Sequence, residues 1–407
     1  MGMLTTRERR EAGWILAICA IPFGLYGWAV FIATFDHDGV IAPHYNAPGS
    51  DFIAFYQAAR SYLQGNLSII YDGTRFTALE NETFAHWLSQ PLPFHPWIYP
   101  PHFLLLVVPF GFLPFGISYA AFVSLSLAGL IWATLCYAPA VDKRLLIASV
   151  LLCPASSLTV LAGQNALLIA ALLIGGIALL PRRPIAAGVL FGLMTVKPSL
   201  GLMLPIALIA SGQWRAFAAA TATALILAAI SLIVFGAGAW ISWLRFFLPT
   251  AAADYTEWEQ SGQLWGISVY AGIAAIGASH AAASAVQAMA IVLAGSAVYL
   301  AFSRPLATDL RLMVLCAATI LAAPHVSPYD TAALGIAATF YGLRMIREGS
   351  TAVAPKLALM LWLAALFGPP RASLVALIVP LFLAGVIGLI FWQASIFASE
   401  RHGAAQG

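Results

Sequence analysis

Apolar runs long enough to cross a bilayer recur along this chain, and they constrain its fold more than any other feature. Of the 407 residues, 61% are hydrophobic and 9% are charged, whereas a soluble domain has about 25% charged residues. The 19 basic and 16 acidic side chains cannot cover a water-soluble enzyme of this length. The same composition excludes disordered, collagen-like, coiled-coil and DNA-binding chains. The sequence therefore predicts an all-α polytopic membrane protein.

The net charge of +3 is too small to indicate a polyanionic partner, and we expect no nucleic acid partner. Four cysteines lie in apolar stretches without C-x-x-C spacing, which favours neither a disulfide framework nor a metal site. Near the N-terminus, three arginines precede an apolar run over Gly13–Thr34. This run is long enough to span a membrane, and no A-x-A cleavage site follows it. We expect a retained first helix with its N-terminus inside.

The short apolar run Pro101–Phe112 decides how the chain threads the membrane. Proline breaks the run, and at a rise of 1.5 Å per residue it reaches roughly 18 Å, less than a bilayer core of about 30 Å. We expect a short interfacial or re-entrant helix on the outer side. Fourteen of the 19 basic residues then lie inside and five outside, as the positive-inside rule favours. Reading the run as a full span would move residues 143, 144, 182 and 183 outside.

This threading predicts one integral membrane domain over residues 1–407, with about twelve spans and both termini in the cytoplasm. Residues 35–113 form a first extracytoplasmic loop with interfacial helices, and residues 236–280 form a second loop region. Leu145–Leu161 and Ala216–Phe235 are each expected to be one helix. Lys197-Pro198 is expected to separate two short helices whose tip lies outside.

The segment from Gly49 to Arg60 is the most informative for chemistry. Ser50 is expected to cap a helix that begins at Asp51, whose carboxylate then lies at the positive end of the helix dipole. An apolar stripe along this helix suits a position at the membrane interface, and its members are Phe52, Phe55, Ala59 and Tyr62. The alternative, that Asp51 merely caps a surface helix, fits the pattern equally well.

Further polar residues lie at expected outer breaks between apolar helices. They are Tyr99, Gln164 and Asn165, Lys197, and His325 with Tyr329. Each has a plainer explanation: an aromatic belt for Tyr99, a helix–helix turn for Gln164 and Asn165, and a hydrogen-bonded core histidine for His325. Lys197 can either snorkel to lipid head groups or neutralise a phosphate in a cavity.

Familiar soluble-enzyme motifs are absent from the sequence. There is no H-E-x-x-H, Walker loop, G-x-G-x-x-G or Cys/His zinc spacing, and no cytoplasmic soluble domain. ATP-driven transport and a nucleotide-sugar donor are therefore disfavoured. No residue cluster requires a metal or another cofactor, so we expect none. Binding of a divalent ion is kept as the alternative.

Several short motifs occur in an order that resembles the family 87 glycosyltransferases of the GT-C superfamily. This family includes mannosyltransferases that depend on polyprenyl-phosphate-mannose. The matching motifs span about residues 50–215. They are Ser50-Asp51-Phe52, Tyr56-Gln57-Ala58-Ala59, Gly65, Tyr71, Tyr99-Pro100-Pro101, Gly163-Gln164-Asn165, Lys197-Pro198 and Gly212-Gln213-Trp214-Arg215.

The resemblance implies a GT-C-like bundle in the cell membrane with its active site on the extracytoplasmic face. It implies transfer of a sugar, typically mannose, from a polyprenyl-phosphate donor to a lipid or glycan acceptor, with inversion at the anomeric carbon. Asp51 corresponds to the catalytic base. Lys197 and His325, then Arg371 and Arg245, are candidates to bind the donor phosphate. Residues expected to line the substrate pocket are Tyr56, Gln57, Tyr99, Gln164, Asn165 and Tyr329.

Two other functional classes fit parts of the sequence. A flippase or transporter of lipid-linked glycans would explain the helices and Lys197, but it would not need an acidic residue on a helix of the outer loop. A non-enzymatic membrane assembly subunit would explain the composition without any chemistry.

Overall fold

A computed structural model describes residues 5–6, 48–88, 91–251, 266–348, 354–367 and 377–404. Within these ranges the chain forms sixteen α-helices, a few short 3-10 turns and no β-strand, which confirms the all-α fold class. The predicted first helix at Gly13–Thr34 lies outside the described residues.

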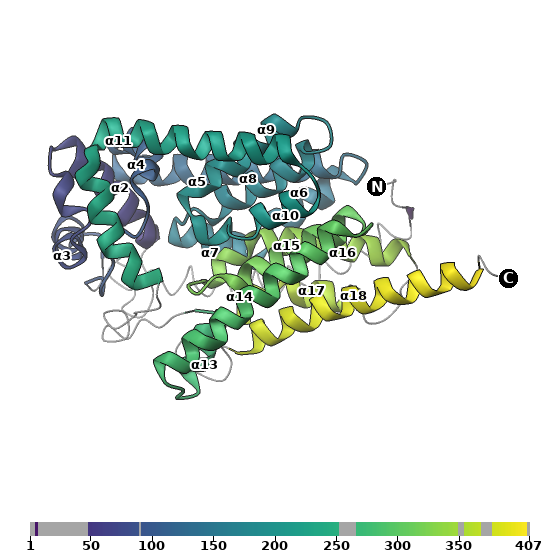
Figure 1. The fold of residues 1–407 in the computed structure, drawn as a ribbon. Coiled ribbons are helices and arrows are strands. Elements are labelled where there is room, and N and C mark those ends of the chain that lie inside the picture. Colours follow the sequence, from purple (N-terminus) through teal and green to yellow (C-terminus); the bar gives the residue numbers. More distant parts are fainter. Residues whose placement is uncertain are drawn as a thin grey trace, which may run out of the picture.

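The helices of the first half begin with a group at one end of the molecule, made of α2 (Ser50–Leu63), α3 (Gly73–Thr83) and α4 (Pro101–Val107) (Figure 1). Helix α4 continues into the 3-10 turn η2 (Val108–Phe112). The chain then forms α5 (Phe115–Tyr137), α6 (Lys143–Leu151), α7 (Pro154–Ala162), α8 (Ala166–Leu179), α9 (Pro184–Leu193), α10 (Leu204–Ala210) and α11 (Trp214–Ala251).

The second half contains α13 (Val269–Ala275), α14 (His280–Ser303), α15 (Thr308–Ala322), α16 (Ala332–Arg347), α17 (Ala354–Trp362) and α18 (Ile378–Ala404). Helices α5 and α8 pack together, as do α9 with α11 and α14 with α15. Figure 1 shows α11 running along one long side of the molecule, and it contacts both α9 and α4. The group α2–α4 is thereby held against the bundle.

Among the described residues, three helices are long and apolar enough to cross a membrane: Phe115–Tyr137, Trp214–Phe246 and His280–Ser303. The pair α6 and α7 passes the same test as one span bent by 52°. Shorter apolar helices include Pro101–Phe112 and Ala166–Leu179. Along α11, Leu225, Ile226 and Ile233 are exposed. Large exposed apolar side chains suit contact with lipid, so this part of the chain indicates an integral membrane protein.

One predicted helix differs in the structure, and the predicted end of another is confirmed. The helix expected over Leu145–Leu161 is broken between α6 and α7, where Pro154 begins the second piece. Proline cannot donate its backbone nitrogen and often breaks or kinks a helix. The helix expected to end at Phe235 is interrupted there, because Gly236 has φ of 78° and ψ of 165°, and a second helical stretch then runs to Ala251. The two short pieces expected around Lys197-Pro198 are confirmed as α9 and α10, joined by 3-10 turns.

The expected capping and orientation of α2 are wrong. The helix begins at Ser50 after Gly49, and the Ser50 side chain is buried without a capping hydrogen bond. Phe52, Phe55 and Ala59 are completely buried, and α2 packs against α4, η2, α5 and α7. The apolar stripe therefore faces protein and not the membrane interface. Apolar periodicity identifies the buried face of a helix, but it does not identify what covers that face.

Two glycines allow α2 and α7 to meet. Gly49 and Gly163 both have φ of 74°, in the left-handed region that L side chains rarely adopt. The Gly49 backbone nitrogen donates to the Leu161 carbonyl over 2.7 Å. A Cβ on Gly163 would lie 2.5 Å from the Phe52 Cβ and 3.2 Å from the Gly49 Cα. The first turn of α2 therefore lies directly against the junction of α7 and α8.

We predict that Gly163→Ala destabilises the protein more than Gly212→Ala. Both glycines have positive φ, but a Cβ on Gly212 meets no atom within 4 Å. The left-handed conformation costs alanine about 1–2 kcal/mol at either position, and crowding at Gly163 adds about 1–3 kcal/mol. Apparent unfolding temperatures in detergent measure the difference. Equal losses for the two variants would contradict the close contact between α2 and α7.

Candidate active site

Asp51 lies in the first turn of α2, where the contact with α7 brings it beside Gln164. Its side chain is 21% exposed, so solvent or a substrate can reach the carboxylate. Gln164 Nε2 donates to Asp51 Oδ2 over 3.2 Å. The pairing joins residues 113 positions apart in the sequence.

The Gln164 side chain links Asp51 to two tyrosines from other segments. The Tyr99 hydroxyl donates to Gln164 Oε1 over 2.9 Å, and the Asn165 backbone nitrogen donates to the same oxygen over 2.9 Å. Gln164 Nε2 also approaches the Tyr329 hydroxyl at 3.5 Å. Because a backbone N–H can only donate, it fixes which end of the amide is oxygen. The amide nitrogen is therefore directed at Asp51 and Tyr329.

Tyr99 is held in turn by an aromatic cluster. The Tyr71 hydroxyl donates to the Tyr99 carbonyl over 3.1 Å, and Trp97 Nε1 donates to the Tyr71 hydroxyl over 3.3 Å. The Phe55 ring lies edge-on to Tyr99 at 5.2 Å, and Phe103 lies 4.8 Å from it. These contacts fix the segment that carries Tyr99 against the buried face of α2.

On the other side of Asp51 lies a histidine between two carboxylates. His95 Nε2 is 4.0 Å from Asp51 Oδ1, and His95 Nδ1 is 3.0 Å from Glu80 Oε2. Burial alone would lower the pKa of His95, but the carboxylates of Glu80 and Asp51 outweigh burial and raise it to about 9. Burial also raises the pKa of Glu80, which is completely buried. At neutral pH the imidazole beside Asp51 therefore carries a positive charge.

A second charge pair lies beyond Tyr329. Lys197 Nζ donates to Asp330 Oδ1 over 2.5 Å, with side-chain exposures of 10% and 2%. The Lys197 ammonium also lies 5.5 Å from the centre of the Tyr329 ring. Asp330 Oδ2 accepts a hydrogen bond from the Ser327 backbone nitrogen over 3.1 Å. Tyr329 thus contacts Gln164 through its hydroxyl and Lys197 through its ring.

The model of glycosyltransferase family 87 matches residues 97–328, more than half of the chain. The chain belongs to glycosyltransferase family 87. Membership of this family implies a membrane glycosyltransferase with a sugar donor and an acceptor. No curated protein and no solved structure matches the chain. The matched range contains Tyr99, Gln164 and Lys197, while Asp51 and His95 precede it.

In this family 87 chain, five of the residues singled out from sequence come together in one connected cluster: Asp51, Tyr99, Gln164, Lys197 and Tyr329. His325 lies near the same charges, because the pKa of its imidazole responds to both Asp330 and Lys197. Burial lowers the pKa of His325, so its imidazole is neutral near pH 7. Arg371 lies outside the described residues.

The other expected residues have different surroundings. The Tyr56 hydroxyl donates to the Leu113 carbonyl over 3.0 Å, and Gln57 is buried with its amide 3.4 Å from Ser61 Oγ. The Asn165 side chain is completely buried. Arg245 is exposed on the part of α11 that follows Gly236. Sequence reasoning missed the roles of His95 and Glu80, because neither belongs to a motif and they lie 15 positions apart.

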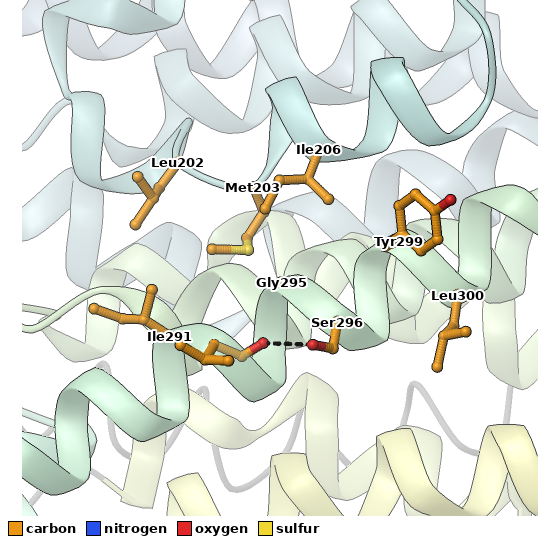
Figure 2. A pocket seen from close by; sticks show the side chains of 9 residues that line it. Leu202, Met203, Ile206, Ile291, Gly295, Ser296, Tyr299 and Leu300 are labelled. Carbon is orange, nitrogen blue, oxygen red and sulfur yellow. Dashed lines mark hydrogen bonds between the residues drawn. The ribbon is translucent and has the colours of Figure 1, made fainter.

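An apolar cavity and the lack of a metal-binding group among the described residues complete the description of this part of the chain. An apolar cavity of about 600 Å³ lies between α14 and the chain around the start of α10, and Figure 2 shows the side chains that line it. Its lining includes Leu202, Met203 and Ile206 on one side and Ile291 and Gly295 on the other. Within the described ranges, no three His, Cys, Asp or Glu side chains are arranged to hold a metal ion.

We predict that the Lys197–Asp330 pair is required for stability. Removing one partner leaves a buried charge unpaired, which costs about 3–5 kcal/mol, whereas replacing both by apolar residues restores much of the loss. Lys197→Met and Asp330→Leu should therefore each lower the unfolding temperature, and the double variant should recover. Arg75→Gln is the control, because its pair with Asp72 has side chains 73% and 44% exposed. Additive losses in the double variant would contradict the buried pair.

Proposed function

We propose that this family 87 enzyme transfers a hexose, mannose by the resemblance, from a polyprenyl-phosphate donor to a hydroxyl of a lipid or glycan acceptor. In this proposal Asp51 is the catalytic base, and the reaction inverts the configuration at the anomeric carbon. The observation that supports it best is the partly exposed Asp51 carboxylate, which lies among the buried Gln164 and Tyr99 and the half-buried His95 and Tyr329.

The chemistry needs one proton acceptor near the acceptor hydroxyl. The hydroxyl oxygen forms a bond to the anomeric carbon while the bond from that carbon to the phosphate oxygen breaks. The hydroxyl proton passes to Asp51, and the electron pair of the broken bond leaves with the phosphate. A carboxylate has about four lone-pair positions, and Gln164 and His95 approach from two directions. The remaining positions are available to the hydroxyl.

The leaving phosphate needs cationic stabilisation at the opposite side of the sugar. Lys197 is our candidate, because Tyr329 joins it to the Gln164 amide that contacts Asp51. An ammonium has three donors, of which one is directed at Asp330. Neutral His325 can add a hydrogen bond from the same side, and Arg371 remains a candidate. In this proposal Asp51 and Lys197 thus lie at opposite ends of the contact between Gln164 and Tyr329.

The apolar surroundings support a lipid-linked donor. The cavity in Figure 2 runs along α14 and is lined mainly by apolar side chains, among them Leu202, Met203 and Ile291. A polyprenyl chain is apolar and its phosphate is anionic, so the protein can supply an apolar cavity for the first and the Lys197 ammonium for the second. A nucleotide-linked sugar would leave the apolar cavity without a partner.

We further propose a GT-C-like bundle of about twelve spans that opens this site to the extracytoplasmic side. Helix α8 begins next to Gln164 and ends before Arg182 and Arg183, which are exposed. Basic residues concentrate on the cytoplasmic side of membrane proteins. The end of α8 that is distant from Asp51 therefore has the charge expected of the cytoplasmic face.

Asp51→Asn is expected to lower turnover by at least about 100-fold, because positioned general bases contribute about 100-fold to 10,000-fold. Asparagine keeps the shape of the side chain but cannot accept the proton at neutral pH. Transfer of radiolabelled hexose from polyprenyl phosphate by the purified protein measures this effect, with donor binding measured in parallel. Asp72→Asn, at the exposed N-cap of α3, is the control and should retain activity. Near wild-type turnover by Asp51→Asn would exclude its assignment as the base.

Cysteine labelling tests the proposed sidedness. In a variant without its native cysteines, cysteine replaces either Glu82 or Arg182, both of which are exposed. A membrane-impermeant thiol reagent applied to intact cells should label the Glu82→Cys variant. It should label Arg182→Cys only after the membrane is permeabilised. The opposite pattern would show that the site faces the cytoplasm.

A further inference from the structure

The segment that carries His95 is fixed to one face of α3. The Thr77 hydroxyl oxygen accepts a hydrogen bond from the His95 backbone nitrogen over 2.9 Å. The Asn81 side chain donates to the Leu92 carbonyl over 2.9 Å and accepts from the Leu92 nitrogen over 2.6 Å. Thr77 and Asn81 are one turn apart and lie on either side of the Glu80 position. Helix α3 therefore determines where the His95 backbone lies.

Glu80 then determines the direction of the imidazole. Its Oε2 accepts from His95 Nδ1 over 3.0 Å, and the carboxylate is completely buried. A histidine that bonds through Nδ1 presents Nε2 on the opposite side of the ring. Here Nε2 is directed to Asp51 Oδ1 at 4.0 Å. Burying a carboxylate is unfavourable unless it is paired, so a completely buried Glu80 behind this histidine requires the contact between them.

We propose that His95, oriented by Glu80, is a positioning residue that holds the Asp51 carboxylate for transfer and limits the reaction at alkaline pH. The inference rests on the proposed role of Asp51 as the base. Gln164 contacts Oδ2 of Asp51 and His95 faces Oδ1, so the carboxylate is held from both sides. At 4.0 Å, His95 Nε2 lies at ion-pair distance from Oδ1 and beyond hydrogen-bond distance, so its positive charge attracts the carboxylate.

The protonation of His95 depends on the two carboxylates that face it. These are Glu80 from α3 and Asp51 from α2, and together they overcome burial and raise the pKa of His95 to about 9. The Tyr99 and Tyr329 hydroxyls meet the Gln164 side of Asp51, and burial raises the pKa of both well above the ordinary value. His95 therefore stays charged at neutral pH and loses its proton as the pH rises through about 9. The positioning charge is present below that pH and absent above it.

Turnover measured across pH tests this role. Wild-type kcat should fall as the pH rises through about 9. Glu80→Gln removes the carboxylate that raises the pKa of His95, so the fall should move toward the ordinary histidine value of about 6.5. His95→Gln should lower kcat at pH 7 by about 5-fold, since a partly exposed ion pair worth about 1 kcal/mol is lost. It should also abolish the fall near pH 9 and leave KM for the donor within about threefold.

Two controls separate this inference from general damage and from the proposed function. His86→Gln removes an exposed histidine of the same loop and should leave the pH profile unchanged. The imidazole of His95 is also titrated directly by NMR in the purified protein, identified by its loss in His95→Gln. It should titrate near 9 in the wild type and at lower pH in Glu80→Gln.

The outcomes are distinguishable. If the wild type transfers sugar and Asp51→Asn does not, but His95→Gln retains wild-type kcat and pH profile, the positioning role is wrong while the proposed function stands. The positioning role is also wrong if kcat of Glu80→Gln falls at the same alkaline pH as kcat of the wild type. If the wild type transfers no sugar, the proposed function fails. In that case the NMR titration still tests whether His95 is charged at neutral pH. A wild-type His95 that titrates near 6.5 would show that the two carboxylates do not hold it in the charged form.

Discussion

A single side-chain amide holds the candidate active site together. Gln164 uses its oxygen for Tyr99 and the Asn165 backbone, and it directs its nitrogen at Asp51 and Tyr329. These partners come from four different segments of the chain. The amide can reach them only because Gly49 and Gly163 let the start of α2 lie against the end of α7. Backbone contact between two helices thus sets the geometry of the polar cluster.

The charges around this amide follow a common pattern. His95 is paired with Glu80 and Lys197 with Asp330, and each pair is largely buried. In a low-dielectric interior, such pairs are stable only when both partners stay in contact. Asp51 differs from them, because its carboxylate is partly exposed between the two pairs. Within this cluster, Asp51 is therefore an accessible carboxylate with charged pairs on both sides, which suits a positioned base next to an anionic leaving group.

The sequence predicted the features that depend on local patterns. The all-α class, the break at Lys197-Pro198 and the helix junction at Gly163-Gln164-Asn165 follow from apolar periodicity, proline and glycine. Contacts between residues that lie far apart in the sequence leave no such local pattern. The pairing of Lys197 with Asp330 joins residues 133 positions apart, and the role of His95 depends on how α3 packs beside α2. The burial of α2 was missed for the same reason, since its apolar face fits protein and membrane equally well.

The most direct test of the account is the identity of the donor and the stereochemistry of transfer. The purified protein in lipid vesicles is given the same radiolabelled hexose on polyprenyl phosphate or on a nucleoside diphosphate, together with a membrane extract as acceptor. The account predicts transfer from the lipid-linked donor alone, with the anomeric configuration inverted in the product. Transfer from the nucleotide-linked sugar, or retention of configuration, would contradict it.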